Sequence, residues 1–436
     1  MFSPLRNAAY RRLFGAQVAA LLGTGLATVA LGLLAHEIAG ASAGEVLGAA
    51  LAIKMIAYVA VAPVAAALAA HAPRKTLLVC LDLVRAGVAA SLPFVSEAWQ
   101  IYALMTVLYV ASAAFTPAFQ AMIPDVLPEE SDYTKALSLS RLAADLESVA
   151  SPVLAALLLA FIGFHDLFAG TAIGFVISAA LVVSAALPLA RTVAPRPFIQ
   201  RLTAGLNLFL HTPRLRALIA LSLATAAGGA MVFVNTVVIV QSDFALTEQA
   251  TAWALAAFGT GSIVAALALP PLLTRWSDRA IVIAGAAMMG VVLATGPYLA
   301  QSYTALLILW SALGVGYSLT LTPIGRVLRR SAHAEDRPAL FAAQFALSHA
   351  CWLIAYPLAG FLSAKFGTDA AFSALAALSA TGAIGALAFW PSHESERLAH
   401  THEGLPADHP HLSGAPSSHA HDYIIDALHP RWPRQT

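Results

Sequence analysis

Long apolar runs separated by short polar turns follow one another along most of the chain. Each run holds about 20 or more predominantly apolar residues, which is enough to cross a bilayer as a helix. We predict twelve such helices, over residues 12–36, 44–70, 76–95, 99–122, 134–161, 167–190, 215–240, 248–273, 280–300, 303–327, 339–363 and 369–390.

Two polar stretches interrupt this pattern and divide the chain into four parts. We expect an N-terminal six-helix half over 1–190, a linker over 191–214 and a C-terminal six-helix half over 215–390. Within the linker, residues 198–211 place apolar side chains on one face, which predicts an amphipathic helix. The last part, 391–436, is polar and rich in Pro, Ser, Gly and His, and we expect it to be disordered.

Composition supports an integral membrane protein. Hydrophobic residues make up 59% of the chain and charged residues 11%, whereas soluble domains carry about 25% charged residues. A net charge of +1 argues against a nucleic-acid partner. The chain has no GxxxxGK[ST] motif for direct ATP coupling, and nothing indicates an enzyme or a cofactor.

Basic residues predict the orientation. Arg and Lys concentrate in the even-numbered connections between the predicted helices, while the odd-numbered connections hold only Lys365. Because positive residues stay on the cytoplasmic side, both termini are expected to be cytoplasmic.

The two predicted halves repeat one another. Three landmarks recur at an offset of 205 or 206 residues, namely Arg74 with Arg279, Pro117 with Pro323, and Pro152 with Pro357. Such parallel repeats, related by an axis along the membrane normal, are a known transporter architecture. The alternative is a coincidence of common residues in apolar sequence.

At these residues the chain resembles the major facilitator superfamily, and more closely its drug:proton antiporter branch, which includes macrolide and siderophore exporters. The resemblance rests on LRNAAYRRLFGAQ, PRKTLLVCLDLVRA, FTPAFQAMIPDVLPEE and LNLFLHTPRLRAL. It implies two pseudo-symmetric six-helix halves that rock about a midplane site. The turn after the second helix usually reads close to GxLaDRxGRR, but here Ala70 and His71 replace its acidic residue and first Arg, while Arg74 and Lys75 remain.

Four residues are gating candidates on this resemblance. Arg74 and Lys75 belong to the turn that stabilises one gating conformation in the family. Asp82 and Arg85 resemble a pair common in this exporter branch, and their spacing of three predicts a local ion pair near the cytoplasmic surface. We expect this pair to be structural or gating and not substrate-binding.

Polar and ionisable side chains gather at one predicted depth of the membrane, where they are costly and therefore indicate function. The substrate-binding candidates are Lys54, Asp145, Glu147, Gln344, His349 and Cys351, and Asp145 and Glu147 are also the proton-coupling candidates. Alternatively, Lys54 or Arg141 only neutralises a carboxylate. His349 can equally be hydrogen-bonded packing, and Cys351 favours packing because a free cysteine behaves as a small hydrophobe.

The histidine clusters in the tail predict metal binding. Its clusters HTH, HPH and HAH contain His400, His402, His409, His411, His419 and His421, and imidazole is a good ligand for nickel, zinc, copper and cobalt. A solvated tail of biased composition and a pH-responsive segment are the alternatives.

A permease with such a tail is similar to the NreB-type nickel-resistance permeases, as is the stretch AAQFALSHACWLIAYPLAG. The resemblance implies export of nickel, or cobalt, from the bacterial cytoplasm, with the tail collecting ions. We therefore predict a proton-coupled efflux transporter of the bacterial inner membrane, a monomer that binds lipid bilayer, protons and a small substrate. Export of a hydrophobic organic compound, such as an antibiotic or siderophore, is one alternative. A non-transporting metal sensor that uses the tail is the other.

Overall fold

The computed structural model describes residues 2–39, 43–68, 72–187, 197–392, 397–401, 412, 418–426, 428–429 and 432–433. Apart from short 3-10 turns at Ser3–Arg6 and Leu92–Phe94, the first half is α-helical. Its helices are α1 (Ala8–Ala39), α2 (Ala43–Leu68), α3 (Arg74–Ser91), α4 (Ala98–Val126), α5 (Glu130–Leu159) and α6 (Phe164–Ser184).

The second half repeats this arrangement after the linker helix α7 (Phe198–His211). Its first helix, α8, continues through a π-helical turn at Val238–Asp243. The helices are α8 (Pro213–Val237), α9 (Glu248–Leu272), α10 (Asp278–Leu299), α11 (Tyr303–Leu321), α12 (Ile324–Arg330), α13 (Arg337–Phe366) and α14 (Thr368–Phe389). The expected helix over 303–327 is therefore divided into α11 and α12, and Pro323, which lacks a backbone N–H, stands at the break.

Ten helical segments of the described chain are long and apolar enough to cross a membrane. The helices α2 and α5 are not among them. In α2 the apolar stretch is the shorter Ala52–Leu68, and α5 carries Arg141, Asp145 and Glu147 along its length. The all-α multi-pass fold predicted from the sequence is confirmed, and the charges of α5 need a polar environment inside the bundle.

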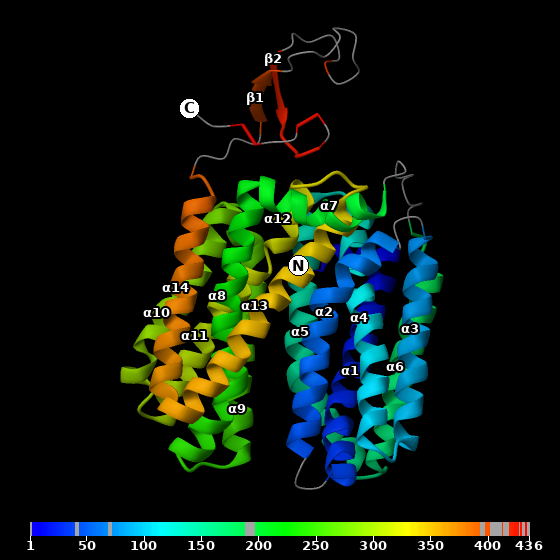
Figure 1. The fold of residues 1–436 in the computed structure, drawn as a ribbon, viewed down its shortest axis with the longest axis vertical. Helices are drawn as coiled ribbons and strands as arrows, with labels where there is room; N and C mark the ends of the chain where they lie inside the picture. Colours follow the sequence, from blue (N-terminus) through cyan, green and yellow to red (C-terminus); the bar gives the residue numbers. More distant parts are fainter. Residues whose placement is uncertain are drawn as a thin grey trace.

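Equivalent helices pack in equivalent ways within the two halves. In the first half α6 packs against α1 and α3, and in the second half α14 packs against α8 and α10. The halves meet where α2 packs against α13 and where α5 packs against α9. Figure 1 shows the ribbons of the two halves close together on the side of the C-terminal strands and diverging toward the other end.

Polar contacts join the halves at the end that carries the tail, here called the tail side. Arg337 at the start of α13 pairs with Asp125 at the end of α4 (N–O 2.9 Å), and Arg326 of α12 pairs with Glu130 of α5. Between described residues, no hydrogen bond or ion pair joins the halves at the opposite end. The structure is thus a conformation that is closed on the tail side.

Part of the tail is ordered on this side. Strand β1 (Arg397–Thr401) pairs antiparallel with β2 (Ser418–Asp422), which places His400 opposite His419. Beyond β2, the ring of Trp432 lies 5.3 Å from the guanidinium carbon of Arg214 on α8. For these residues the structure has strand pairing and an aromatic contact where the sequence predicts disorder, and such contacts offset part of the entropy that ordering costs.

Candidate functional site

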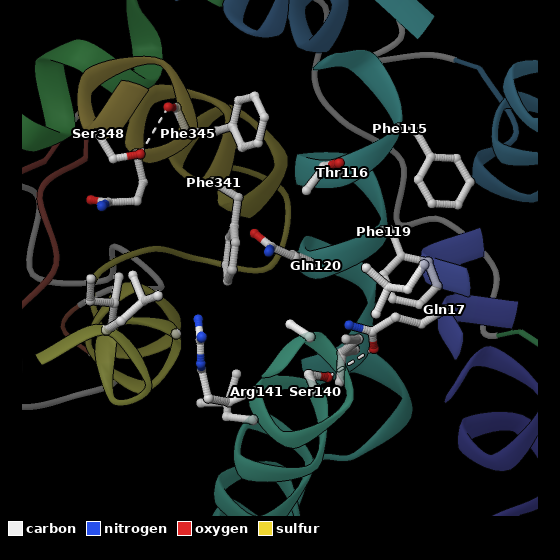
Figure 2. Close-up of a pocket in the computed structure, with 18 of the residues that line it drawn as sticks. Gln17, Phe115, Thr116, Phe119, Gln120, Ser140, Arg141, Phe341, Phe345 and Ser348 are labelled. Atoms are coloured by element: carbon white, nitrogen blue, oxygen red, sulfur yellow. Dashed lines mark hydrogen bonds between the residues drawn. The ribbon is translucent and has the colours of Figure 1, made fainter. Parts of the chain in front are cut away.

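A cavity of about 480 Å³ lies between the two halves. Helices α1 to α5 supply one wall, and α11, α12 and α13 supply the other. Aromatic, amide and hydroxyl side chains predominate, as Figure 2 shows for part of the lining. Members of these classes include Gln17, Tyr58, Ser112, Phe115, Thr116, Phe119, Gln120, Ser140, Phe341, Gln344, Phe345 and Ser348.

The cavity is closed toward the tail side by a close approach of the halves. Tyr133 of α5, fully buried, donates a hydrogen bond to the carbonyl of Gly325 on α12 (Oη–O 3.2 Å). A Cβ atom on Gly325 would lie 2.7 Å from a methyl group of Leu137 and 2.8 Å from the Tyr133 hydroxyl. A larger residue at position 325 therefore requires the ends of the Leu137 and Tyr133 side chains to move.

Arg141 and Asp145 form an ion pair on successive turns of α5. The Arg141 Nε donates to Asp145 Oδ2 (3.0 Å), and a second guanidinium nitrogen contacts Oδ1. Ser262 of α9, in the other half, donates to the same carboxylate (Oγ–Oδ2 2.6 Å). Asp145 is only 2% exposed and is absent from the described cavity wall, whereas Arg141 lines it. The alternative in which Arg141 neutralises this carboxylate therefore describes the structure.

Asp82 and Arg85 form the local ion pair that their spacing predicts. Ser178 of α6 donates to the second oxygen of Asp82 (2.8 Å), and Arg85 lies over the rings of Phe115 (4.0 Å) and Phe175 (4.5 Å). The expected place near the cytoplasmic surface is wrong. Arg85 lies eleven residues into α3, roughly 16 Å along the helix, and it lines the cavity.

Lys54 and Glu147 do not pair with the groups that the sequence suggested. The ammonium of Lys54 lies 5.7 Å from the ring of Tyr58 and 6.0 Å from that of Tyr109. Glu147 faces α1 at Gly25, where a Cβ would be 2.7 Å from its carboxylate oxygen. The two charges act on each other electrostatically, but neither forms an ion pair within the described part of the chain.

The three candidates on α13 have different surroundings. The Nδ1 of His349 is 2.7 Å from the carbonyl of Phe345, and its ring packs on Tyr58 and Phe345 at the cavity wall. Gln344 also lines the cavity and donates to Ser222 of α8 (3.2 Å). Cys351 is buried and turned toward α8, with its sulfur 4.0 Å from the carbonyl of Ile219, and it is not part of the described lining.

The predicted metal constellations do not form among the residues whose placement is described. No group of three or more His, Cys, Asp or Glu side chains that could hold a metal ion occurs there. Asp145, Glu147 and His349 therefore do not meet as one ligand set. Of the tail histidines, His402, His409 and His411 lie outside the described residues, and so do the side chains of His400 and His421.

Arg74 and Lys75 both hold the tail-side end of the first half. Arg74 pairs with Asp125 (2.7 Å), the carboxylate that also binds Arg337 across the halves. Lys75 donates to the carbonyl of Ala185 after α6 (3.0 Å). A tail-side latch is thus present although Ala70 and His71 depart from the family pattern, because Asp125 accepts from both arginines.

The second half has the same latch with its charges exchanged. Arg330 on α12 pairs with Asp278 at the start of α10 (2.9 Å), where the first half has Asp125 and Arg74. Asp278 also forms an ion pair with Arg326 (N–O 3.0 Å), and the Arg326 guanidinium pairs in turn with Glu130 of the first half. The acidic partners Asp125 and Asp278 are not among the gating residues predicted from the sequence. The repeat could have indicated this latch, because Asp125 and Arg330 are separated by the same offset of 205 residues.

Membrane-crossing helices around a central polar cavity define a multi-pass membrane transporter. A family model described as the Major Facilitator Superfamily matches residues 13–238 and 217–420. The chain belongs to this superfamily, whose members are transporters and not enzymes. Its place in the superfamily makes it a secondary transporter.

Relatives and solved structures agree with this assignment. The chain is 31% identical over 120 residues to an uncharacterised MFS-type transporter, YfiS, of Bacillus subtilis (strain 168), and this match spans 28% of each chain. It resembles the crystal structure of the human organic anion transporter MFSD10 (TETRAN) with a TM-score of 0.73 and 12% identity, over 87% of this chain and 99% of that one. The E. coli fucose:proton symporter FucP gives a TM-score of 0.70 and 12% identity, over 88% and 98%.

Proposed function

We propose that the chain is a proton-coupled exporter of amphipathic organic molecules in a bacterial inner membrane. The observation that carries the proposal is the composition of the cavity wall. Aromatic rings alternate there with amides and hydroxyls, and the volume of about 480 Å³ falls in the range of sites for drug-sized ligands. Such a wall binds an apolar body by contact with its rings and orients a polar group by hydrogen bonds.

The same wall disfavours a divalent metal ion as substrate. Transition metals need several nitrogen, oxygen or sulfur ligands that converge on one point. His349 is the one imidazole in the described lining, and its Nδ1 already contacts a backbone carbonyl. The charged groups in that lining, Arg85 and Arg141, are cations. We therefore prefer the organic-substrate alternative to nickel.

Glu147 is the stronger of the two proton-coupling candidates. Asp145 is engaged by Arg141 and by Ser262 of the other half, so its charge serves a structural contact. Glu147 has no ion-pair partner in the described chain and responds to the charge of Lys54. A half-buried carboxylate within the bundle is suited to take up and release a proton during the transport cycle.

The direction of transport and the orientation in the membrane rest on the sequence. The resemblance to the drug:proton antiporter branch supports export, and the basic connections support cytoplasmic termini. The tail side of the structure then faces the cytoplasm, and a conformation closed on that side is the outward-facing one.

Transport in proteoliposomes tests the proposal. Full-length protein would be reconstituted with an imposed proton gradient, and the flux of an organic dye and of radioactive nickel would be measured in parallel. We expect gradient-dependent dye flux and no nickel flux above empty liposomes. Nickel flux without dye flux would overturn the proposal.

A cellular series separates the remaining functions. Tolerance to nickel, cobalt, zinc and copper would be compared in a metal-sensitive strain with and without the protein. We expect unchanged metal tolerance together with increased dye efflux. A transcriptional response to metal that needs residues 391–436, without any flux, would instead identify a sensor.

A further inference from the structure

Two Arg–Asp pairs have the same orientation relative to the cavity, with the arginine on the cavity side of each pair. Arg85 and Arg141 line the cavity, while their partners Asp82 and Asp145 are 0% and 2% exposed and lie outside the described lining. Each pair is neutral as a whole, but its positive end faces the cavity and its negative end faces the protein. The described wall contains no Asp or Glu side chain to offset this.

This polarity selects the sign of a bound charge. Coulomb energy falls with distance, and within a protein the effective dielectric is well below that of water. An acidic group in the cavity meets the guanidinium before the carboxylate behind it and is attracted. A cation at the same place meets the positive end first and is repelled.

Of the two arginines, Arg141 is the better placed to bind a substrate. Arg85 is covered by the rings of Phe115 and Phe175. Arg141 touches both halves, since its Nε donates to Ser262 (3.2 Å) and its guanidinium carbon lies 5.0 Å from the ring of Tyr317. Figure 2 shows its guanidinium projecting from α5 toward Phe341 in the interior of the pocket.

A second polar group in the wall has unused hydrogen-bonding capacity. Gln344 is 8% exposed and lines the cavity. Its amide nitrogen donates to Ser222, whereas its Oε1 has no hydrogen-bond partner in the described structure. An unpaired buried acceptor is costly, and a donor group on a substrate would satisfy it.

We propose that the substrate is an organic anion with an aromatic body, and that Arg141 binds its carboxylate, sulfonate or phosphate group. This inference rests on the proposed function, since it names the substrate class of the same cavity. Guanidinium groups hold such acids by paired, charge-assisted hydrogen bonds. The rings of Phe341 and Phe345 lie in the same lining and can cover the aromatic body.

The charge balance of this site bears on proton coupling. If Asp145 took up a proton when the anion bound Arg141, proton and anion would occupy the same state and travel together. Exchange of an outgoing anion for an incoming proton requires a second group that is protonated in the other state. Glu147, which has no ion pair in the described chain, meets that requirement.

A matched pair of probes tests the inference. A naphthalene sulfonate and the corresponding naphthalene sulfonamide share ring and shape, and only the first is charged at neutral pH. Binding would be measured by the thermal stabilisation of the purified full-length protein, and transport by counterflow in proteoliposomes. We expect the sulfonate to bind at least about tenfold more tightly, as a hydrogen-bonded charge requires.

Two variants locate the effect. Arg141→Gln alone leaves Asp145 without its cation and risks misfolding, so the neutral pair Arg141→Gln/Asp145→Asn accompanies it. In the double variant we expect the ratio of sulfonate to sulfonamide affinity, measured by thermal stabilisation, to fall to near unity. The control is Arg216→Gln, which removes an exposed arginine near the tail side that contacts Phe389, and it should keep the preference.

The outcomes separate this inference from the proposed function. Equal binding of both probes by the unmodified protein, with gradient-dependent transport of either, would overturn the anion assignment and leave the organic exporter standing. A preference that survives in the double variant would overturn the role of Arg141. Failure to transport either probe would count against the proposed function itself.

Discussion

At the residue scale, the central cavity shows how a membrane protein keeps charges at the middle of the bilayer. Asp145 has a guanidinium and a hydroxyl as partners, and Asp82 has the same two kinds of group. These hydrogen-bonded pairs limit the cost of burying charge. Glu147 differs because it is half-buried and no ion pair joins it to another described residue, although the charge of Lys54 acts on it.

Replacing Glu147 with glutamine should uncouple transport from the proton gradient. The amide has the same shape but cannot take up a proton, so we expect gradient-driven efflux to fall to near the level of empty liposomes. Substrate binding should change less than about threefold, since the side chain is not part of the described lining. The measurement is proton release by a pH-sensitive dye alongside substrate flux.

An exposed carboxylate controls for loss of negative charge in general. Glu129 lies in the tail-side turn before α5 and is exposed, and Glu129→Gln should retain coupling. Gradient-driven efflux that persists in Glu147→Gln would exclude Glu147 as the proton carrier.

Replacing Asp145 with asparagine should destabilise the protein by about 3 kcal/mol, because it leaves a buried cation without its partner. Thermal unfolding in detergent measures this loss. Restoring neutrality with Arg141→Gln in the same chain should recover most of the stability. If the single and double variants unfold at the same temperature, the ion pair contributes little to folding.

At the scale of elements, the contact between α5 and α12 closes the tail side. Gly325 allows these elements to approach, and the break between α11 and α12 at Pro323 turns α12 so that its arginines reach α5 and α10. Arg74 pairs with Asp125 in the first half, and Asp278 pairs with Arg330 in the second half with the charges exchanged. The two ion pairs hold the tail-side ends of the two halves in the same way. Closure therefore depends on shape as well as on ion pairs.

A larger side chain at position 325 should hold the tail side open. In Gly325→Val the added atoms would overlap Tyr133 and Leu137, so the closed conformation loses population. The measurement is alkylation of a cysteine introduced at Ser140, with a membrane-impermeant maleimide added from the tail side. We expect the rate to rise at least about fivefold, which corresponds to a population shift of roughly 1 kcal/mol.

The matched control is Gly87→Val. Gly87 is exposed on α3, and a Cβ there meets nothing within 4 Å. Its alkylation rate should equal that of the parent. A similar rise in both variants would show that the glycine contact is not what closes the tail side.

At the scale of the whole molecule, the tail docks on the tail side. Asp426 lies between two imidazoles, with His429 Nδ1 at 2.8 Å and His333 Nε2 at 3.4 Å. The hydrogen bond with Asp426 is the main cause that raises the pKa of His333 above its usual value, with Glu335 and Asp336 adding to it while burial opposes it. Burial also opposes ionisation of Asp426, but hydrogen bonds from His333 and His429 hold its pKa below the usual range.

Docking of the tail should weaken as the pH rises. Because the pKa of His333 is raised in the docked state, its contribution is fully present below its undocked pKa of about 6.5. That contribution is lost as the pH rises through the raised value. Asp426, whose pKa is lowered, stays ionised across this window. The fluorescence anisotropy of a dye at the C-terminus should therefore fall between mildly acidic and alkaline pH.

Two variants test the origin of that change. His333→Ala should lower the anisotropy at acidic pH and flatten its pH dependence. His211→Ala removes an exposed histidine whose Nδ1 contacts Asn207 within α7, and it should leave the profile intact. An unchanged profile in His333→Ala would exclude this contact as the docking point.

The class of the protein and its fold follow from patterns along the chain. Apolar runs of membrane-spanning length and the repeat at 205 residues are local or periodic signals, and each is complete within the sequence. The spacing of Asp82 and Arg85, and of Arg141 and Asp145, likewise allows a pair on one helix face. For that reason these two pairs could be named from the sequence.

Which side chains share the cavity depends instead on how the helices pack in three dimensions. The rotation of a helix about its axis and the choice of its neighbour depend on contacts between residues far apart in the chain. Those contacts turn Cys351 toward α8, direct Glu147 to Gly25 and bring Ser262 to Asp145. They also place the arginines in the wall and the aspartates behind it. Apolar sequence specifies that a helix is buried in the membrane but not which way its few polar residues face.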